Sequence, residues 1–267
     1  MTVYTVALSK GGSTKTTTAA EIVAALTRTG RRVLAIDLDH QGTLSQRLGI
    51  TDDSEVAAVA AEVLTGEEDA HAATAAPSVP RAHVLPGTYE LNTLENRPEV
   101  VTSLRDHLPQ VAGEWDDVVI DTPPAQGVVT LAALAAADVV VAAVACEAEA
   151  YDQVPRLQEL IAYRVAPRLR PGQRLHWIIP TRYDARRLHD RDVLENLREE
   201  HPGTVTTPVR ETVTVRDSYL AGQPASVYAP DSPVAEDYAA ALAGVITAST
   251  AQTNETAQTT STKETSA

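Results

Sequence analysis

Ser9-Lys10-Gly11-Gly12-Ser13-Thr14-Lys15-Thr16-Thr17 is the stretch that decides the fold of this chain. It follows an apolar run from Val3 to Leu8 and opens an Ala-rich run from about Thr16 to Thr29. The first run predicts a buried strand and the second a helix. A Gly-rich turn between a strand and a helix N-terminus is the setting of a phosphate-binding loop, because its backbone N–H groups and the positive end of the helix attract an anion. The stretch therefore predicts a nucleotide-binding α/β protein.

Lysine usage points to the same loop. The chain has three lysines, and two of them are Lys10 and Lys15. Arginine carries the remaining positive charge almost alone, which indicates that the loop requires a compact ammonium group on a flexible stem. In such a loop we expect Lys15 to bridge the β- and γ-phosphates and the Thr16 hydroxyl to ligate Mg²⁺. A Gly-rich turn capped by threonine is the simpler alternative, and the flanking strand and helix argue against it.

Length and composition bound the class of protein. The chain has 267 residues, 43% of them hydrophobic and none of them phenylalanine, which predicts one large α/β domain with an aliphatic core. The single cysteine, Cys146, excludes a disulfide framework and a Cys-rich metal cluster within one chain. We find no signal-peptide pattern and no apolar run long enough to span a membrane. These features predict a cytoplasmic protein.

Charge is distributed unevenly. The net charge of −14 argues against a protein coated with nucleic-acid-binding groups. Residues 164–191, however, hold eight arginines against two aspartates, a local charge of +6. This window is a candidate for contact with an anionic partner, and a solvated arginine-rich face is the equally weighted alternative.

Strand and helix patterns alternate along the chain, which predicts a doubly wound, mostly parallel sheet flanked by helices. We expect a single P-loop domain over residues 1–246. A disordered Thr/Ser/Ala-rich tail is expected over residues 247–267, where large apolar residues are almost absent. Further strands are predicted at 32–36, 83–85, a run ending at Asp121, 139–144, 175–179, 205–209 and 226–228, and further helices at 55–64, 100–111, 131–137, 151–165, 191–200 and 233–246.

Three aspartates follow predicted strands. Asp37 and Asp39 come directly after the strand at 32–36, and Asp121 ends the apolar run that precedes Pro123 and Pro124. A doubly wound sheet binds ligands at the carboxyl ends of its strands. We therefore expect Asp37 and Asp121 to hold Mg²⁺ through its water ligands and Asp39 to orient the attacking water. Capping of a turn is a serious alternative for Asp39.

The loop and the acids together carry a family resemblance. Lys10-Gly11-Gly12-x-x-Lys15-Thr16-Thr17 resembles the deviant Walker A motif of the ParA/MinD group of P-loop ATPases, whose extra lysine is Lys10 here. Residues 37–42, Asp-Leu-Asp-His-Gln-Gly, resemble the D-x-D-P-Q-G motif of ParA proteins, and residues 121–124, Asp-Thr-Pro-Pro, match their Walker B segment. Residues 183–186 and 221–224 also resemble C-terminal ParA segments. The similarity runs from about Val3 to Ile246.

The resemblance implies an ATP-dependent homodimer with ATP and Mg²⁺ between two subunits, in which Lys10 reaches the partner's phosphates. It further implies slow hydrolysis, nonspecific nucleoid DNA binding by the ATP-bound dimer, and stimulation by a ParB-type centromere-binding partner during partition of plasmids or chromosomes. Arg186 matches a position of DNA contact, and Arg187 and Arg216 are its neighbours by analogy. The nucleotide-binding residues implied for this chain are Lys10, Gly11, Gly12, Ser13, Thr14, Lys15, Thr16 and Thr17, with Thr181, Arg182, Pro208, Val209 and Arg210 near the adenine.

Two residues depart from the family pattern. Thr14 stands where the family has glycine before the P-loop lysine, which places a Cβ and a hydroxyl beside the phosphates. His40 replaces proline and makes a less rigid turn after Asp39. Neither change removes an expected ligand.

Other functions remain open at this stage. A MinD-like membrane-positioning ATPase requires a basic amphipathic C-terminus, whereas residues 252–267 hold one lysine and no large apolar residue. A metabolic relative, such as an amidating synthase or a nitrogenase-type reductase, is a second alternative, and the reductase requires cluster-binding cysteines that Cys146 alone does not supply. A third is a nucleotide-dependent DNA clamp with negligible hydrolysis.

Overall fold

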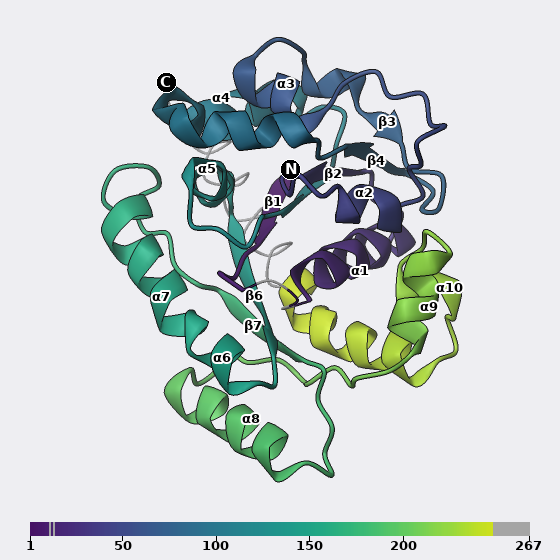
Figure 1. Cartoon of the computed structure of the whole chain (residues 1–267), viewed down its shortest axis with the longest axis vertical. Helices are drawn as coiled ribbons and strands as arrows, with labels where there is room; N and C mark the ends of the chain where they lie inside the picture. Colours follow the sequence, from purple (N-terminus) through teal and green to yellow (C-terminus); the bar gives the residue numbers. More distant parts are fainter. Residues whose placement is uncertain (11, 13, 248–267) are drawn as a thin grey trace, which may run out of the picture.

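A seven-stranded sheet forms the centre of the computed structural model, which describes residues 1–10, 12 and 14–247 (Figure 1). The strand order is β3-β4-β2-β5-β1-β6-β7, and every neighbouring pair is parallel except β3 with β4. The predicted doubly wound, mostly parallel fold is confirmed. The strands are β1 (Thr2–Val6), β2 (Val33–Asp37), β3 (Thr74–Ala75), β4 (Ala82–Leu85), β5 (Asp117–Asp121), β6 (Val139–Ala145) and β7 (Trp177–Thr181).

Helices cover both faces of the sheet (Figure 1). The α-helices are α1 (Lys15–Arg28), α2 (Thr43–Arg47), α3 (Ala60–Thr65), α4 (Ser103–His107), α5 (Val128–Ala136), α6 (Ala148–Tyr151), α7 (Gln153–Leu160), α8 (Leu188–Glu200), α9 (Thr214–Leu220) and α10 (Ala225–Tyr228), and residues 233–247 form a C-terminal helix. Short 3₁₀ segments are η1 (Ala70–Ala72), η2 (Tyr89–Asn96), η3 (Pro98–Thr102) and η4 (Leu108–Val111), and η5 (Ile161–Val165) is one turn of π-helix.

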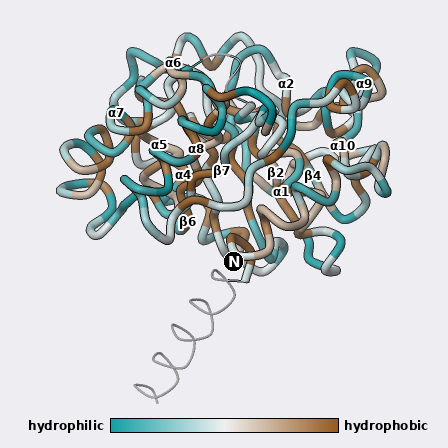
Figure 2. The backbone as a smooth tube through the Cα atoms, turned by 90° about the horizontal axis from the view of Figure 1, so that it is seen from below, coloured by the Kyte–Doolittle hydropathy of each residue, from teal (hydrophilic) through white to brown (hydrophobic). Residues whose placement is uncertain are grey.

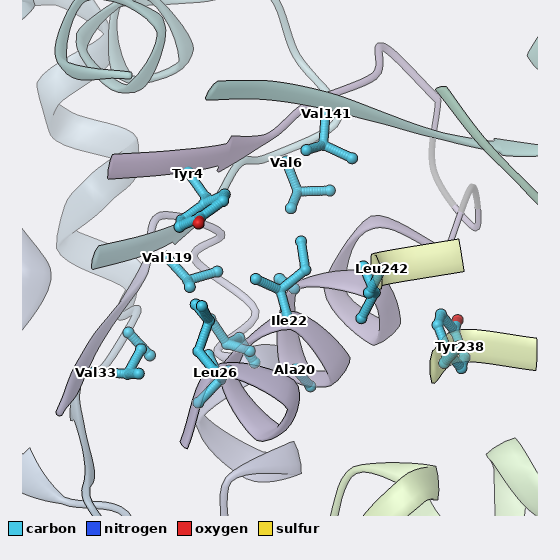
Figure 3. Packing of buried hydrophobic residues seen from close by; sticks show 14 of the residues in the cluster. Tyr4, Val6, Ala20, Ile22, Leu26, Val33, Val119, Val141, Tyr238 and Leu242 are labelled. Carbon is cyan, nitrogen blue, oxygen red and sulfur yellow. The ribbon is translucent and has the colours of Figure 1, made fainter. Parts of the chain in front are cut away.

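Side chains along each strand point alternately to the two faces of the sheet, so the hydrophobic core has one part on each face. Along β6, Val139, Val141 and Ala143 face the layer of α1 and the C-terminal helix, while the residues between them face α5 and α7. Figure 3 shows Ile22 and Leu26 of α1 directed at Tyr4, Val6 and Val119 of the sheet. Figure 2 shows the hydrophobic segments gathered inside and the hydrophilic ones outside. The packing fixes α1, and therefore the loop before it, against β1.

The parallel register brings the carboxyl ends of β1, β2, β5, β6 and β7 to one edge. Val6 of β1 and Asp37 of β2 are both register partners of Asp121 in β5. Ala145 of β6 is paired with Thr181 of β7. The loop after β1 and the acids after β2 and β5 are thus neighbours because of the sheet alone, as expected from the sequence.

Two predicted strands are wrong. Residues 205–209 run beside β7 and form one isolated bridge to it, between Val205 and Ile178, because Pro180 and Pro208 have no N–H groups with which to complete a ladder. Residues 226–228 belong to the short helix α10, whose first turn follows Pro224, with the Val227 and Tyr228 N–H groups donating to the Pro224 carbonyl. The fixed φ of proline favours a helix start there over a three-residue strand.

Three predicted helices are broken or displaced. Pro109 ends α4 and leaves a 3₁₀ turn in place of the second half of a helix over 100–111. The helix predicted at 151–165 begins earlier, at Ala148, and is interrupted at Asp152, ahead of Pro155. The helix predicted at 55–64 begins only at Ala60. The C-terminal helix is confirmed and includes Thr247, and the predicted tail from residue 248 lies outside the described residues.

The arginine-rich window does not form one surface. Arg170 lies before β7 and pairs with Asp138 at the amino end of β6, whereas Arg182, Arg186 and Arg187 follow the carboxyl end of β7. A five-residue strand separates the two groups by roughly 15 Å. Only the second group lies at the edge that carries the phosphate loop.

His176 links acid pH to stability. Its Nδ1 accepts a hydrogen bond from the Val140 N–H at 3.0 Å, which requires a neutral ring with its proton on Nε2. Burial, followed by the guanidinium groups of Arg174 and Arg170, lowers the pKa of His176 to about 4, although Asp138 opposes the shift.

Because the folded pKa lies below the unfolded value of about 6.5, the neutral ring's contribution is complete above pH 6.5 and is lost as pH falls toward 4. The protein is expected to lose about 2 kcal/mol of stability from this residue between pH 7.5 and pH 5. His176→Asn supplies an acceptor oxygen that does not titrate, so its loss over the same range, measured by urea unfolding, should be smaller by that amount. Equal losses in both proteins would contradict the assignment.

Candidate nucleotide-binding site

A cavity of about 970 Å³ opens at the carboxyl edge of the sheet. It is lined by the phosphate loop, by the segments after β2 and β7, and by the segment that leads into α9. Its lining residues are Gly12, Thr14, Lys15, Thr16, Thr17, Asp39, Thr43, Arg47, Pro124, Thr181, Arg182, Arg187, Val209, Arg210, Glu211, Thr212, Val213, Val215, Arg216 and Tyr238. Loop, acids and cavity therefore form one site.

Lys15 is the buried cation of the site. Its ammonium group donates to the Lys10 carbonyl at 3.1 Å, which closes the loop on itself. Burial lowers the pKa of Lys15, and the carboxylates of Asp121 and Asp39 oppose that shift. Among the described residues the ammonium has one hydrogen-bond acceptor, a neutral carbonyl, so it can donate further to phosphate oxygens.

Asp37 and Asp121 are adjacent and fully buried, but their surroundings differ. The Ser45 N–H and hydroxyl donate to Asp37 at 2.9 and 2.8 Å, and the Asp39 N–H donates to it at 3.2 Å. Burial raises the pKa of Asp37 to about 6, although these hydrogen bonds oppose the shift. The hydrogen bonds from Ser45 thus tie Asp37 to the first turn of α2.

Asp121 has no such support. Neither of its carboxylate oxygens has a hydrogen bond of ordinary geometry from any described residue. Burial, and next the Asp37 carboxylate, raises the pKa of Asp121 to about 8, while the nearby Thr16 hydroxyl and Lys15 ammonium oppose the rise. A buried carboxylate without partners requires compensation that the described residues do not provide.

Asp39 combines a turn-capping role with access to the cavity. Its Oδ1 accepts from the Gln41 N–H at 3.0 Å, the capping interaction that the sequence left open. The residue also lines the cavity, together with the phosphate-loop residues Thr14 and Lys15. Gly87 makes this arrangement tight, because a Cβ there would lie 2.2 Å from the Asp39 carbonyl oxygen.

Thr14 has a defined place in the loop. It adopts a left-handed conformation, with φ of 70°, immediately before α1. Its hydroxyl lies 2.6 Å from the Thr181 hydroxyl at the end of β7. The side chain that replaces the family's glycine thus ties the phosphate loop to the strand on the far side of the cavity.

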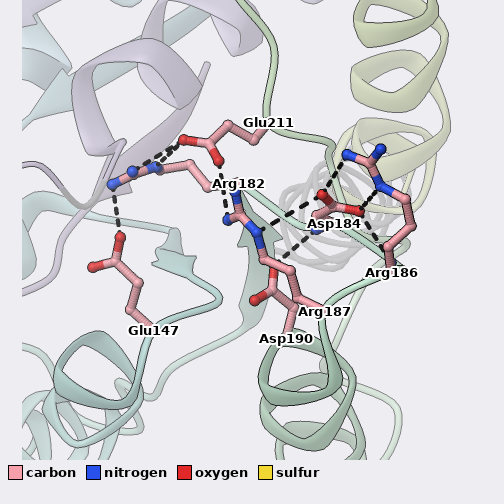
Figure 4. A network of polar contacts seen from close by, with 7 residues as sticks. All are labelled: Glu147, Arg182, Asp184, Arg186, Arg187, Asp190 and Glu211. Carbon is pink, nitrogen blue, oxygen red and sulfur yellow. Dashed lines mark hydrogen bonds and ion pairs between the residues drawn. The ribbon is translucent and has the colours of Figure 1, made fainter.

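An alternating chain of ion pairs runs along the rim of the site. Lys10 contacts Glu147 at 2.9 Å and Glu149 at 3.1 Å, and Glu147 in turn contacts Arg182 at 2.8 Å. Figure 4 shows Arg182 extending between Glu147 and Glu211. The hydrogen bond that Lys10 donates to Glu147 is the main cause of the raised pKa of Lys10. In this state Lys10 is held by its own subunit.

The three arginines expected at DNA are separated by their contacts. Arg186 is 90% exposed and forms a two-point pair with Asp184 at 2.8 and 2.9 Å. Arg187 lies between Asp184 and Glu211 and also lines the cavity (Figure 4). Arg216 lies on α9 and lines the cavity from the opposite side.

Most of the expected nucleotide contacts are brought together. Gly12, residues 14–17, Thr181, Arg182, Val209 and Arg210 line the cavity. Pro208 instead lines a smaller neighbouring cavity with Asp184 and Arg186, Lys10 lies on the rim, and Gly11 and Ser13 lie outside the described residues. Sequence reasoning missed residues that come from short elements or distant segments without a recognisable motif, namely Thr43, Arg47, Glu211, Thr212, Val213, Val215 and Tyr238.

The strand–loop–helix unit, with Lys15 at its turn and Asp121 on the adjacent strand, defines a P-loop NTPase with a deviant Walker A loop. The AAA domain family matches residues 1–169. The chain is 32% identical over 240 residues to the chromosome partitioning protein ParA of Myxococcus xanthus, covering 86% of this chain and 83% of that protein. It is 30% identical over 234 residues to the sporulation initiation inhibitor protein Soj of Bacillus subtilis, covering 86% and 92%.

Among solved structures, cobyrinic acid a,c-diamide synthase from Mycobacterium smegmatis, with bound ADP and magnesium, is 34% identical with a TM-score of 0.70, covering 85% of this chain and 91% of that one. The chain belongs to the AAA domain family and, within it, to the ParA/Soj family of chromosome partitioning proteins. In the part of the chain that the structure describes, no helix is long and apolar enough to cross a membrane.

Thr14 gives a test of the loop geometry. A non-glycine residue at φ near 70° is strained, and both Thr14→Ala and Thr14→Gly remove the hydroxyl that contacts Thr181. Thr14→Gly is therefore expected to be more stable than Thr14→Ala by about 1 kcal/mol in urea unfolding. At the exposed helical position Glu195 the order should reverse, with alanine more stable than glycine by a similar amount. The same order at both positions would show that Thr14 is not left-handed in solution.

Proposed function

We propose that this chain is an ATP-dependent partition ATPase that dimerises on ATP, binds DNA nonspecifically and hydrolyses ATP slowly until a ParB-type partner stimulates it. The observation that carries the proposal is the fully buried Asp121 carboxylate near Lys15 and Thr16, which themselves line the cavity of about 970 Å³. Neither Asp121 oxygen has a hydrogen bond of ordinary geometry from any described residue. The ADP and magnesium in the Mycobacterium smegmatis structure support the choice of ligand.

The residues present fit Mg²⁺ bound together with a nucleotide. Thr16 offers a hydroxyl oxygen, and Asp121 offers a carboxylate for the water ligands of the ion. No group of three or more His, Cys, Asp or Glu side chains suited to a metal occurs among the described residues, which agrees with an ion held largely by phosphates and water. Mg²⁺ would offset the negative charge that develops on the transferred phosphoryl group.

The protein's own groups supply position and charge. Lys15 lies where its ammonium can exchange the Lys10 carbonyl for phosphate oxygens, and the N-terminus of α1 adds its positive end. Asp39 is fixed by the Gln41 N–H through one oxygen, so its other oxygen can accept a proton from a water molecule and orient it toward the γ-phosphate. Thr181, Arg182, Val209 and Arg210 form the wall proposed for the adenine.

Lys10 is proposed to act on the nucleotide of the partner subunit. In the isolated subunit its ammonium is shared by Glu147 and Glu149, so a transfer to phosphate must replace both contacts. A triphosphate carries more concentrated charge than two carboxylates and can compete for the ammonium. Dimerisation would then depend on ATP, because ATP supplies the charge that draws Lys10 across the interface.

DNA contact is proposed for the arginines beyond β7. Arg186 is exposed and Arg187 is half-exposed, and phosphates could replace the Asp184 carboxylate as their partner. Binding of this kind would be nonspecific and would place the protein at the nucleoid. Arg216 lines the nucleotide cavity, so its contribution to DNA binding would be sensitive to bound nucleotide.

Asp121→Asn tests the catalytic assignment. ATP hydrolysis in the presence of Mg²⁺, DNA and the partner is expected to fall at least ~100-fold, because the water shell of the ion loses its carboxylate acceptor. The unliganded variant should be at least as stable as the wild type, since it loses a buried carboxylate to which no described residue donates a hydrogen bond of ordinary geometry. Asp52→Asn, at an exposed position, should change neither quantity. Full hydrolysis by Asp121→Asn would contradict the proposed role.

The DNA assignment is tested by reversing charge. The double variant Arg186→Glu and Arg187→Glu is expected to weaken DNA binding by ~10-fold or more in the presence of ATP, and to flatten its dependence on salt, because fewer counterions are released. Arg164→Glu, on the exposed part of η5, is the matched control. Unchanged DNA binding by the double variant would refute the contact.

An amidating synthase is the second candidate, since the Mycobacterium smegmatis structure is 34% identical and carries that title. Hydrolysis that responds to DNA and to a centromere-binding protein favours partition, whereas hydrolysis that responds only to an acid substrate and an amide donor favours the synthase. A MinD-like membrane role would appear as ATP-dependent flotation of the full chain with liposomes.

A further inference from the structure

Arg47 is a buried cation to which the proposed phosphate-loop mechanism assigns no role. It ends α2, is 8% exposed and lines the nucleotide cavity. Its Nε and Nη1 have no hydrogen-bond partner among the described residues. Burial lowers the pKa of Arg47 below its ordinary value. An unsatisfied, buried guanidinium is costly, so a ligand that satisfies it would be bound with a corresponding gain.

The surroundings of Arg47 hold the group in place without neutralising it. Its guanidinium carbon lies 4.9 Å from the centre of the Tyr219 ring, a cation–π distance. The Tyr219 hydroxyl donates to the Gln46 side chain, which fixes the ring against α2. Stacking of this kind orients the plane of the guanidinium and leaves its N–H groups directed at the edges, where they can donate to an acceptor.

Glu21 on α1 is the acid that could neutralise Arg47, but the two make no ion pair within 4.0 Å in the described structure. One Glu21 oxygen accepts from the Ser226 N–H at 3.2 Å, and the other has no partner among the described residues. The Glu21 carboxylate is close enough to raise the pKa of Arg47 without contacting it. An internal ion pair therefore does not explain why the arginine is buried here.

Arg216 provides a second guanidinium in the lining of the same cavity. It lies one helical turn before Tyr219 on α9, lines the same cavity and makes no ion pair with any described residue. The other three cavity arginines, Arg182, Arg187 and Arg210, each pair with a carboxylate. The two cavity arginines that pair with no carboxylate of the described residues thus lie on α2 and α9, which contact each other.

We propose that Arg47 and Arg216 form a second phosphate-binding subsite in the nucleotide cavity, separate from the phosphate loop. The ligand is a phosphate oxyanion, supplied either by the α-phosphate of the bound nucleotide or by a separate phosphate beside it. The proposal deepens the proposed function, because it rests on nucleotide binding in this cavity. Binding at this subsite would join α2, which carries Ser45 and the Asp37 contact, to α9 across the ligand.

The test uses Arg47→Met, which keeps a long apolar side chain against Tyr219 and removes the charge. Isothermal titration with Mg·ADP and with AMP is the first arm, and the thermal shift caused by inorganic phosphate in ADP-saturated protein is the second. If the α-phosphate occupies the subsite, both nucleotides should bind ~10- to 100-fold more weakly to the variant. If a separate phosphate occupies it, nucleotide binding is kept and the phosphate-dependent shift is lost. Wild-type responses in both arms, with or without a loss of stability, would overturn the proposal.

Three further variants serve as controls for this test. Arg47→Lys keeps the charge but not the planar guanidinium. In whichever of the two measurements Arg47→Met changes, Arg47→Lys should show a smaller loss of ligand response. It also replaces Arg47→Met as the test variant if Arg47→Met does not fold. Glu21→Gln should keep both the nucleotide response and the phosphate response. If Arg47 were instead buried to form an ion pair with Glu21, Glu21→Gln would lose as much stability as Arg47→Met. Arg164→Met, at an exposed position, should match the wild type. Absence of Mg·ATP binding by the wild type would reject the proposed function, whereas normal binding with an unresponsive Arg47→Met rejects this inference alone.

Discussion

The site depends on the placement of two buried carboxylates side by side. Asp37 and Asp121 are register partners on adjacent parallel strands, so their separation is fixed by sheet hydrogen bonds and cannot relax. The two carboxylates repel each other, and the fold stabilises only one of them with hydrogen bonds. Asp37 accepts hydrogen bonds from Ser45 and Asp39, whereas no described residue donates a hydrogen bond of ordinary geometry to Asp121. The Asp121 carboxylate lies near Lys15 and Thr16, and the Mg²⁺ proposed for this site would offset its charge.

The sequence was sufficient to predict what depends on local order along the chain. Residues 9–17 lie between a strand and a helix, and the carboxyl ends of β2 and β5 follow from runs of apolar residues, so the loop and its acids could be placed before any coordinates. Parallel pairing then brings them together without further information. The resemblance added Lys10 as a distinct lysine, and the structure shows the acids that hold it in the subunit.

What the sequence could not predict depends on contacts between distant segments. Thr14 was a departure without a role until its hydroxyl was found beside Thr181, 167 positions later. Arg47 has no motif around it, and only the packing of α2 on α9 shows that its charge is buried. The positive window at 164–191 was misleading as a surface, because β7 lies inside it and sends its two halves to opposite ends of the sheet.

The ion pairs along the rim of the site also determine the electrostatic field that this edge of the protein presents at long range. The four cations of these ion pairs, Lys10, Arg182, Arg186 and Arg187, are matched by four carboxylates, Glu147, Glu149, Asp184 and Glu211. Beyond a Debye length of about 8 Å at physiological salt, such an array presents almost no net field. A polyanion would therefore not be steered to this edge from afar, and any attraction would arise only at contact, as phosphates take the place of the carboxylates. The surrounding surface of this acidic protein, at −14 overall, would meanwhile repel it, so capture would depend on geometry and on nucleotide state more than on bulk charge.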